Sequence, residues 1–126
     1  MGLAASVETV TRSPPVTALF SDTVASIIEK MVANNIGAVI VMSGGAPAGI
    51  VTERDIVEKI ARGRKDPEKT RAQDVMSSPL VGIEAGRSVK DALRLMRDKK
   101  IRRLAVTRSG RLIGIVTERR VLDSLV

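Results

Sequence analysis

The sequence has no cysteine, no histidine, no tryptophan and no tyrosine, and Phe20 is its only aromatic residue. Without cysteine and histidine the chain has no zinc-finger ligands, no thiol nucleophile and no Ser-His-Asp triad. Disulfides are excluded as well, which favours a cytoplasmic protein over a secreted one. We therefore expect a protein that is not an enzyme, holds no metal and requires no cofactor.

Charge is distributed unevenly along the 126 residues, which are enough for one ordinary domain or two small ones. Residues 64–126 contain 16 basic and 8 acidic side chains, whereas residues 1–63 contain 5 and 6, so the net charge of +7 resides in the second half. A cationic half attracts anions such as phosphate ligands or nucleic acid. The alternative is the solvated, arginine-rich surface common in thermophile proteins.

One uncharged run, residues 31–52, is long enough to cross a bilayer. Asn34, Asn35 and the turn residues at 43–47 interrupt it, so the run is interpreted as buried strands joined by a turn. Residues 1–7 lack the basic start and apolar core of a signal peptide. We expect no association with a membrane.

An internal repeat organises the chain. A shift of 65 residues aligns 10–61 with 75–126 without a gap and with 15 identities, and the run Gly49–Arg54 recurs unchanged as Gly114–Arg119. A repeat of this length indicates a duplicated structural unit. We expect a first repeat at 1–63 with its core at 10–61, a polar linker at 64–74 and a second repeat at 75–126.

Each copy predicts the order strand-helix-strand-strand-helix, which is an α+β fold. Extended segments at 16–17 and 80–83 precede helices that Thr23 and Ser88 cap, and hairpin strands follow at 38–42 and 49–51 and at 104–106 and 112–116. The first helix of the first copy carries one broad apolar face, made by Val24, Ile27, Ile28, Met31 and Val32. The second helix of each copy is also apolar on one side, with Ile56, Val57 and Ile60 in the first copy matched by Val121, Leu122 and Leu125 in the second. Units this small bury little surface alone, so we expect the copies to pack with pseudo-twofold symmetry around a cleft.

Three motifs in this frame are specific: Asp-Val-Met-Ser-Ser-Pro at 74–79, Gly-Ile-Val-Thr-Glu-Arg-Asp at 49–55 and Ile-Arg-Arg-Leu-Ala-Val at 101–106. Over nearly the whole chain, from about Val10 to Val126, the pattern resembles the tandem CBS domain pair, or Bateman module, of stand-alone CBS-domain proteins. The resemblance implies a regulatory module that binds AMP, ADP, ATP or S-adenosylmethionine in the cleft between the repeats. It also implies an energy or metabolite sensor that forms a homodimer through its helices and regulates a partner protein.

Thr52 and Asp55 are the first candidate ligand-binding residues. Thr52 stands where a strand meets a helix, and Asp55 follows one helical turn later on the same side. A helix start suits a phosphate, and family resemblance assigns the carboxylate to the ribose hydroxyls. The Thr-x-x-Asp pattern is also an ordinary capping box, and this alternative stays open.

The remaining candidates follow from the resemblance, which places an adenine between the first strand segment and the start of the middle strand. Val16 and Ile36 could equally be ordinary core residues. The adenine candidates in the two copies are Pro14, Val16, Ile36, Gly37 and Ala38, with Pro79, Val81 and Ile101.

The two copies differ where the resemblance places the phosphate and the ribose. Gly37-Ala38 occupies the place of a basic pair that the second copy retains as Arg102-Arg103, whereas Arg120 replaces the ribose-binding aspartate. We hypothesise a nucleotide with its ribose on Asp55 and its phosphates on Arg102 and Arg103. Further candidates are Arg54, Thr117 and Arg119. The second site should prefer a more anionic or non-ribose ligand, or stay empty.

Two other functions remain open from the sequence alone. The basic second half meets the electrostatic requirement for nucleic acid, although base-stacking aromatics are missing. A ligand-free interaction scaffold is the other alternative.

Overall fold

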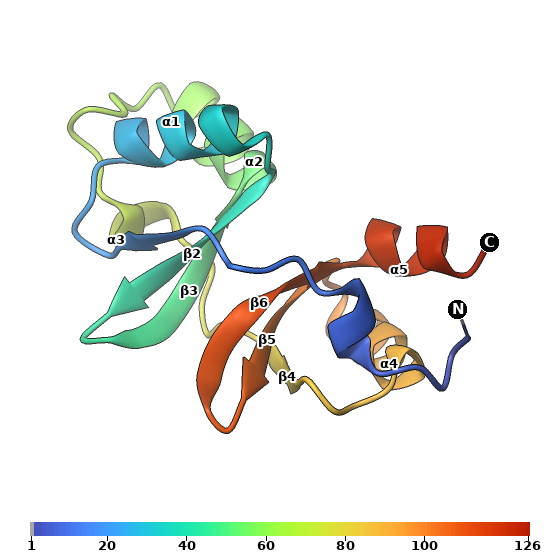
Figure 1. Ribbon diagram of the computed structural model, residues 1–126. Helices are drawn as coiled ribbons and strands as arrows, with labels where there is room; N and C mark the ends of the chain where they lie inside the picture. The colour runs from blue at the N-terminus through green and yellow to red at the C-terminus, as the bar shows by residue number, and fades with distance from the viewer. Residues whose placement is uncertain (1) are drawn as a thin grey trace. The chain divides into compact units, whose positions relative to one another are not determined.

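The structure is a computed structural model that describes residues 2–126. The chain forms two compact units, and each is described by itself (Figure 1). The first-repeat unit is Val16–Leu80, and the second-repeat unit combines the N-terminal stretch up to Pro15 with Val81–Val126. Sorted in this way, the second-repeat unit has 13 basic and 6 acidic residues and the first-repeat unit has 8 of each. The whole net charge of +7 therefore belongs to the second-repeat unit.

The first-repeat unit is a three-stranded sheet covered by helices. Its elements are β1 Thr17–Leu19, α1 Val24–Asn34, β2 Ala38–Ser43, β3 Ala46–Thr52, α2 Glu53–Asp55, the π-helical turn η2 Ile56–Ala61 and α3 Ala72–Val75. Strand β2 lies between β1, to which it is parallel, and β3, to which it is antiparallel. Ala38 is opposite Thr52 in this register, so β3 delivers Thr52 to the end of the sheet where α2 begins.

The second-repeat unit repeats this plan. Its elements are the 3-10 turn η1 Val7–Val10, β4 Gly82–Glu84, α4 Val89–Lys99, β5 Arg103–Arg108, β6 Arg111–Thr117 and α5 Glu118–Ser124. The strand order is β4-β5-β6 with the same parallel and antiparallel pairings, and Arg103 is opposite Thr117. The α+β class and the doubled strand-helix-strand-strand-helix order are confirmed.

Local signals start and stop the long helices as the sequence predicts. The Thr23 hydroxyl accepts a hydrogen bond from the Ser26 N–H at 3.2 Å before α1, and the Ser88 hydroxyl accepts one from the Asp91 N–H at 3.0 Å before α4. Each helix ends on a residue with a left-handed backbone, Asn35 with φ 50° and Lys100 with φ 57°. These two residues are 65 positions apart. The repeat therefore extends to the backbone conformation of the helix ends.

Each unit has its own aliphatic core. In the first-repeat unit Val24, Ile27 and Met31 turn inward against buried strand residues such as Val39 and Val51. Val32, predicted to share the apolar face of α1, is 76% exposed, because the buried stripe is only wide enough for part of that face. The second helix also differs from expectation: α2 is a short turn that continues as π-helical η2, and Val57 is exposed at 62%.

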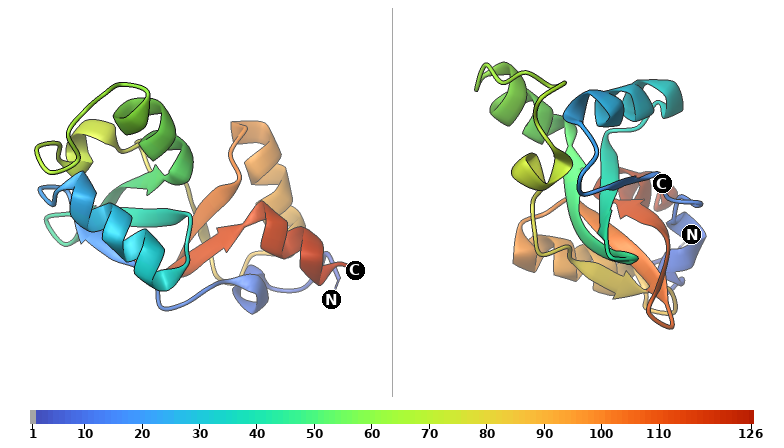
Figure 2. Two further views of the ribbon diagram at one scale, coloured as in Figure 1. Left: turned by 90° about the horizontal axis from the view of Figure 1, so that it is seen from above. Right: turned by 90° about the vertical axis from the view of Figure 1, so that its left-hand side faces the viewer.

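The N-terminal segment of each repeat packs in the unit built mainly by the other repeat. Val7 and Val10 are buried in the core of the second-repeat unit, and the blue N-terminal segment lies against the orange and red elements of that unit in Figures 1 and 2. Ala72 and Val75 of α3 are buried in the first-repeat unit, within and just after the stretch that the sequence suggests is a linker. Linear repeat boundaries therefore do not coincide with the compact units.

Paired backbone hydrogen bonds hold both segments at equivalent positions. Arg12 and Ile115 exchange N–H···O=C bonds of 2.8 and 3.0 Å, and Ser77 and Ile50 exchange bonds of 2.9 and 3.0 Å. Residues 12 and 77 are 65 apart, as are 50 and 115. The repeat thus places residues 12 and 77 beside the last strand of their respective units.

No helix in residues 2–126 is long and apolar enough to cross a membrane. The candidate bilayer-length run at 31–52 contains the end of α1 and the β2–β3 hairpin, as its turn residues predict.

The start of α4 provides a pH-dependent prediction. The Arg87 Nε–H donates to the Asp91 carboxylate at 3.0 Å and the Ser88 N–H donates to it at 3.4 Å, and these bonds hold the pKa of Asp91 below its ordinary value of 3.8. A lowered folded-state pKa stabilises the fold above the ordinary value, and this contribution is lost as the pH falls through the lowered value. We expect Asp91→Asn to destabilise the protein at neutral pH, with the difference from wild type vanishing in acid. Urea unfolding at several pH values measures this, and a difference independent of pH would contradict it.

Candidate functional site

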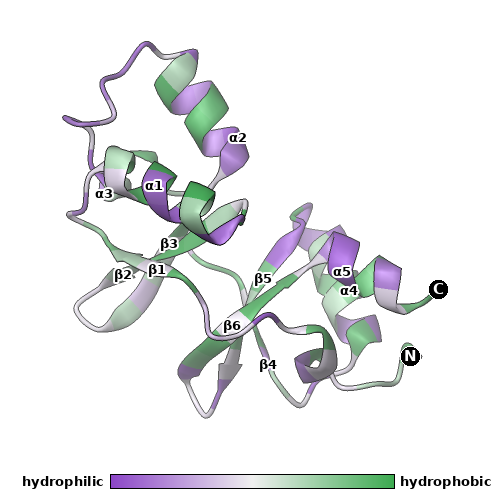
Figure 3. Cartoon of the chain, turned by 45° about the horizontal axis from the view of Figure 1, so that its top comes forward, coloured by the Kyte–Doolittle hydropathy of each residue, from purple (hydrophilic) through white to green (hydrophobic). Residues whose placement is uncertain are grey.

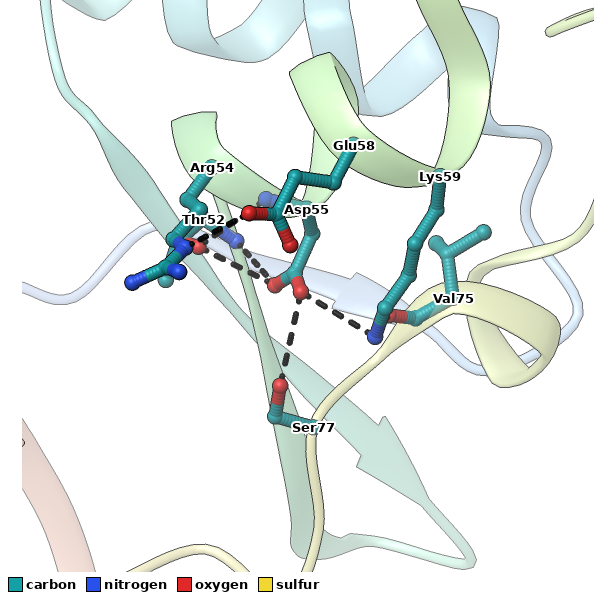
Figure 4. Close-up of polar contacts among 7 residues, drawn as sticks. All are labelled: Thr52, Arg54, Asp55, Glu58, Lys59, Val75 and Ser77. Carbon is teal, nitrogen blue, oxygen red and sulfur yellow. Dashed lines mark hydrogen bonds and ion pairs between the residues drawn. The ribbon is translucent and has the colours of Figure 1, made fainter. Parts of the chain in front are cut away.

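Asp55 is the buried centre of a polar cluster at the junction of β3 and α2 (Figure 4). It is 7% exposed, and its Oδ2 accepts hydrogen bonds from the Thr52 N–H at 2.8 Å and the Thr52 hydroxyl at 3.1 Å. Its Oδ1 lies 3.1 Å from the Lys59 Nζ and 3.4 Å from the Ser77 Oγ. The carboxylate is therefore fully engaged by groups from three segments of the first-repeat unit.

The local geometry realises the capping box that the Thr-x-x-Asp pattern allows. The Thr52 hydroxyl accepts from the Asp55 N–H at 3.3 Å, while the Asp55 carboxylate accepts from the Thr52 N–H. Only Oδ2 is needed for the cap. Oδ1 is held by the Lys59 ammonium at 3.1 Å, whereas its Ser77 bond, at 3.4 Å, is the longest contact of the carboxylate.

Lys59 and Ser77 are the members of this cluster that the sequence analysis did not identify. Lys59 follows Asp55 at a spacing of four, which is a readable helical ion-pair signal. Its Nζ also donates to the Val75 carbonyl at 2.7 Å and so ties the second helix to α3. Ser77 is 22 residues from Asp55, and only the docking of its segment along β3 brings the two together.

Arg54 points away from this cluster. Its Nε–H donates to Glu58 at 2.9 Å, and its side chain is 83% exposed (Figure 4). A solvent-exposed pair of this kind contributes little stability and can open easily. Arg54 is thus available to a ligand only after it leaves Glu58.

Four of the five candidate adenine residues in the first-repeat unit lie beside this junction. Val16 and Ile36 are partly buried and pack against the core, as the packing alternative expects, and Pro79 is exposed. Gly37 accepts the Glu53 N–H on its carbonyl at 3.0 Å, and Ala38 pairs with Thr52. Val16, Ile36, Gly37 and Ala38 therefore border the end of the sheet where α2 begins. Their role in adenine binding stays a prediction.

Ile36 also contributes to an apolar groove of about 480 Å³ between α1 and the second helix. Its lining is aliphatic apart from Asn35 and Glu53, and includes Val32 and Val57. Exposed apolar surface of this extent commonly serves association. The predicted homodimer remains a prediction.

In the second-repeat unit, four of the predicted residues line one cavity of about 360 Å³. These are Arg102, Arg103, Thr117 and Arg119. Val81 and Ile101 pack against the core, and Pro14 is exposed. The Arg102-Arg103 pair is therefore in a different unit from Asp55, and the shared-nucleotide hypothesis stays a prediction.

The start of α5 differs from that of α2 in its polar group. The Thr117 hydroxyl accepts from the Arg120 N–H at 3.2 Å, so the side-chain cap is retained. The residue at position 120 is an arginine, which has only donors and cannot close a capping box. The same backbone frame therefore presents a carboxylate in one unit and a guanidinium in the other.

No group of three or more acidic residues within residues 2–126 is arranged to hold a metal ion.

Comparison with known proteins places these features in a family. The CBS domain family matches residues 7–62 and 72–126. The chain is 39% identical over 120 residues to the protein MK0525 of Methanopyrus kandleri, covering 94% of this chain and 61% of that protein. It is 33% identical over 110 residues to the mitochondrial CBS domain-containing protein CBSX3 of Arabidopsis thaliana, covering 83% and 53%. The chain thus spans just over half to about 60% of the length of these two relatives.

Solved structures share the fold across the chain. A putative signal-transduction protein with CBS domains from Burkholderia ambifaria matches with a TM-score of 0.87 at 28% identity, covering 97% of this chain and 94% of that one. The CBS domain protein PAE2072 from Pyrobaculum aerophilum, solved in complex with AMP, matches with a TM-score of 0.84 at 24% identity, covering 96% and 98%. With both repeats matched by the family and the fold shared with its solved members, the chain belongs to the CBS domain family, as a tandem pair of these regulatory ligand-binding domains.

Proposed function

We propose that this CBS pair is a regulatory sensor that binds an adenosine nucleotide, with AMP as the first ligand to test, and that the first-repeat unit binds its ribose. The observation that carries the proposal is the Asp55 carboxylate, which is buried, held through Oδ2 by Thr52 and bonded on Oδ1 to Lys59 and, by a long bond of 3.4 Å, to Ser77. The AMP complex of the Pyrobaculum aerophilum protein supports the choice of ligand.

The ribose binds by replacing the Ser77 hydroxyl as a partner of Asp55. A cis diol donates two hydrogen bonds to a carboxylate, and such bonds to a charged acceptor are stronger than those between neutral groups. The Ser77 hydroxyl, at 3.4 Å, is the partner most easily displaced. Lys59 keeps its bond to the Val75 carbonyl and stays close enough to neutralise the buried charge.

The other groups of the nucleotide are bound by residues around the same junction. The adenine lies against the aliphatic faces of Val16 and Ile36, because flat apolar surface with nearby backbone polar groups suits a base. Arg54 turns from Glu58 to the phosphate, which offers it a stronger bidentate partner than an exposed carboxylate. Regulation then acts on a partner protein, with no chemical step in this chain.

The Asp55→Asn variant tests the proposal. The amide nearly preserves the shape of the side chain and retains an oxygen to cap Thr52, but it offers the diol a neutral group in place of a charged one. We expect AMP to bind at least ~10-fold more weakly, because a hydrogen bond to a charged group contributes about 1.5–3 kcal/mol. Isothermal titration calorimetry measures the change.

Asp66→Asn is the matched control, because Asp66 is exposed in the loop before α3 and its loss alters the net charge equally. AMP affinity should be unchanged in this variant. Equal AMP affinity in wild type and Asp55→Asn would refute the ribose assignment. Absence of any thermal stabilisation by adenosine, AMP, ADP, ATP and S-adenosylmethionine would refute the proposed function, since a ligand at 100 times its Kd adds ~2.7 kcal/mol of stability.

Nucleic-acid binding is the weaker candidate. The positive charge is concentrated in the second-repeat unit, which satisfies the electrostatic requirement. The one aromatic residue, Phe20, belongs to the other unit, so the charged unit has no ring on which a base could stack.

A further inference from the structure

We propose that the second-repeat unit contains a separate anion site in which Arg12, Arg119 and Arg120 bind a pyrophosphate group without recognising a ribose. The inference goes beyond the proposed function, because it concerns the other unit and a ligand that needs no nucleoside.

The site is a cavity of about 260 Å³ at the junction of β6 and α5. The three arginines line it together with Ile115, Thr117 and Asp123. The larger cavity lined by Arg102 and Arg103 shares Thr117, Arg119 and Asp123 with it, so the two cavities adjoin in one region of the unit. Five guanidinium groups therefore border this region, and the start of α5 is correspondingly hydrophilic in Figure 3.

The repeat shows that this charge replaces an acidic site on the same backbone. Position 120 corresponds to Asp55 and position 12 to Ser77, which contact each other in the first-repeat unit. Arg12 and Ser77 are held by equivalent pairs of backbone hydrogen bonds to Ile115 and Ile50. Two substitutions at adjacent positions thus change a carboxylate–hydroxyl pair into two guanidinium groups.

The other residues around Asp55 also differ from their counterparts in the second-repeat unit. Lys59, which neutralises Asp55, corresponds to Ser124, as expected when there is no carboxylate to neutralise. Arg54 pairs with Glu58, but the equivalent Arg119 and Asp123 form no ion pair. Within residues 2–126, neither Arg119 nor Arg120 has a carboxylate within ion-pair distance. Arg119 and Arg120 therefore have no ion-pair partner among these residues, and Asp123 is the carboxylate that lines the same cavity.

This chemistry selects linked phosphates. Planar guanidinium groups bind phosphate oxygens in bidentate fashion. Several such groups together match a ligand with two linked phosphates better than they match a single small anion. The position that would accept ribose hydroxyls is occupied by Arg120, which has only donors. Inorganic pyrophosphate and the phosphate tail of a nucleoside diphosphate share the recognised group.

Calorimetric titration of inorganic pyrophosphate into the full chain tests the inference. We expect saturable binding that weakens as salt is raised, because salt screens charge attraction. The double variant Arg12→Ser/Arg120→Asp installs the polar pair of the first-repeat unit and should weaken pyrophosphate binding at least ~100-fold, since it removes two contacts to a charged group. The milder Arg120→Gln, which retains the length of the side chain, should weaken it at least ~10-fold.

The matched control is Lys90→Asp/Arg111→Ser, which changes the charge of the same unit equally at the start of α4 and at the far end of β6. It should bind pyrophosphate like wild type. Equal losses in this control, no loss in either arginine variant, or no binding of pyrophosphate to the wild type would overturn the inference. Circular dichroism shows that each variant is folded.

Two further arms separate the ligand source and the proposed function. If Asp55→Asn binds ADP and loses this binding when Arg12→Ser/Arg120→Asp is added, the ligand is the phosphate tail of a nucleotide. If Asp55→Asn binds pyrophosphate but not ADP, the ligand is the free anion. Pyrophosphate should bind to Asp55→Asn as it does to wild type. Loss of pyrophosphate binding in Asp55→Asn would overturn the separate site, whereas failure of AMP to bind would refute only the proposed function.

Discussion

Gly114→Ala is expected to lower the free energy of unfolding by about 3 kcal/mol, at the upper end of the usual cost of overpacking. A Cβ at this position would lie 2.4 Å from the Arg12 carbonyl oxygen and 2.5 Å from the Thr11 Cγ2. The first of these is a backbone atom held by the bonds between Arg12 and Ile115, so it cannot rotate away. The added methyl group should push the N-terminal segment off β6.

Urea unfolding followed by far-ultraviolet circular dichroism measures this effect in a chain without tryptophan. Gly86→Ala is the control, because a Cβ there meets nothing within 4 Å. Gly49→Ala should cost less than Gly114→Ala, because the nearest backbone atom is 2.8 Å away and the other close contacts are the flexible Met76 side chain. A Gly114→Ala protein as stable as Gly86→Ala would show that the N-terminal segment is not packed on β6.

Val7→Ala/Val10→Ala should lower the free energy of unfolding by about 4 kcal/mol, roughly 2 kcal/mol for each buried valine that loses two methyl groups. Val7 is fully buried and Val10 is 3% exposed, and both pack in the core that contains Leu104 and Val116. The cavities would open in the second-repeat unit, although the substitutions are near the N-terminus of the first repeat in the sequence.

Thermal or urea unfolding of Val32→Ala/Val57→Ala gives the comparison, because those valines are 76% and 62% exposed. The exposed pair should change stability by no more than ~0.5 kcal/mol each. Similar losses in the two double variants would indicate that Val7 and Val10 do not belong to the core. Hydrogen exchange adds a local readout: the loss of amide protection should be greatest in β5 and β6.

The two repeats use one backbone frame for different chemistry. Thr52 and Thr117 cap the following helix in the same way, whereas Asp55 and Arg120 present opposite charges three residues later. A carboxylate accepts hydrogen bonds from hydroxyl groups and a guanidinium donates to phosphate, so we propose that the two units divide ribose binding and anion binding between them. The proposed sensor therefore has two sites that differ in what they recognise.

The sequence by itself determined the doubled fold, because hydrophobic periodicity, helix caps and turn residues act over a few neighbours and recur 65 residues later. It also placed Thr52 next to Asp55, since one helical turn separates them. Only the tertiary structure decided that Ser77 contacts Asp55 and that Arg12 joins Arg120 in one cavity. Those neighbours arise because each N-terminal segment buries its valines or alanines in the unit of the other repeat, and nothing local in the sequence specifies which core such a segment completes.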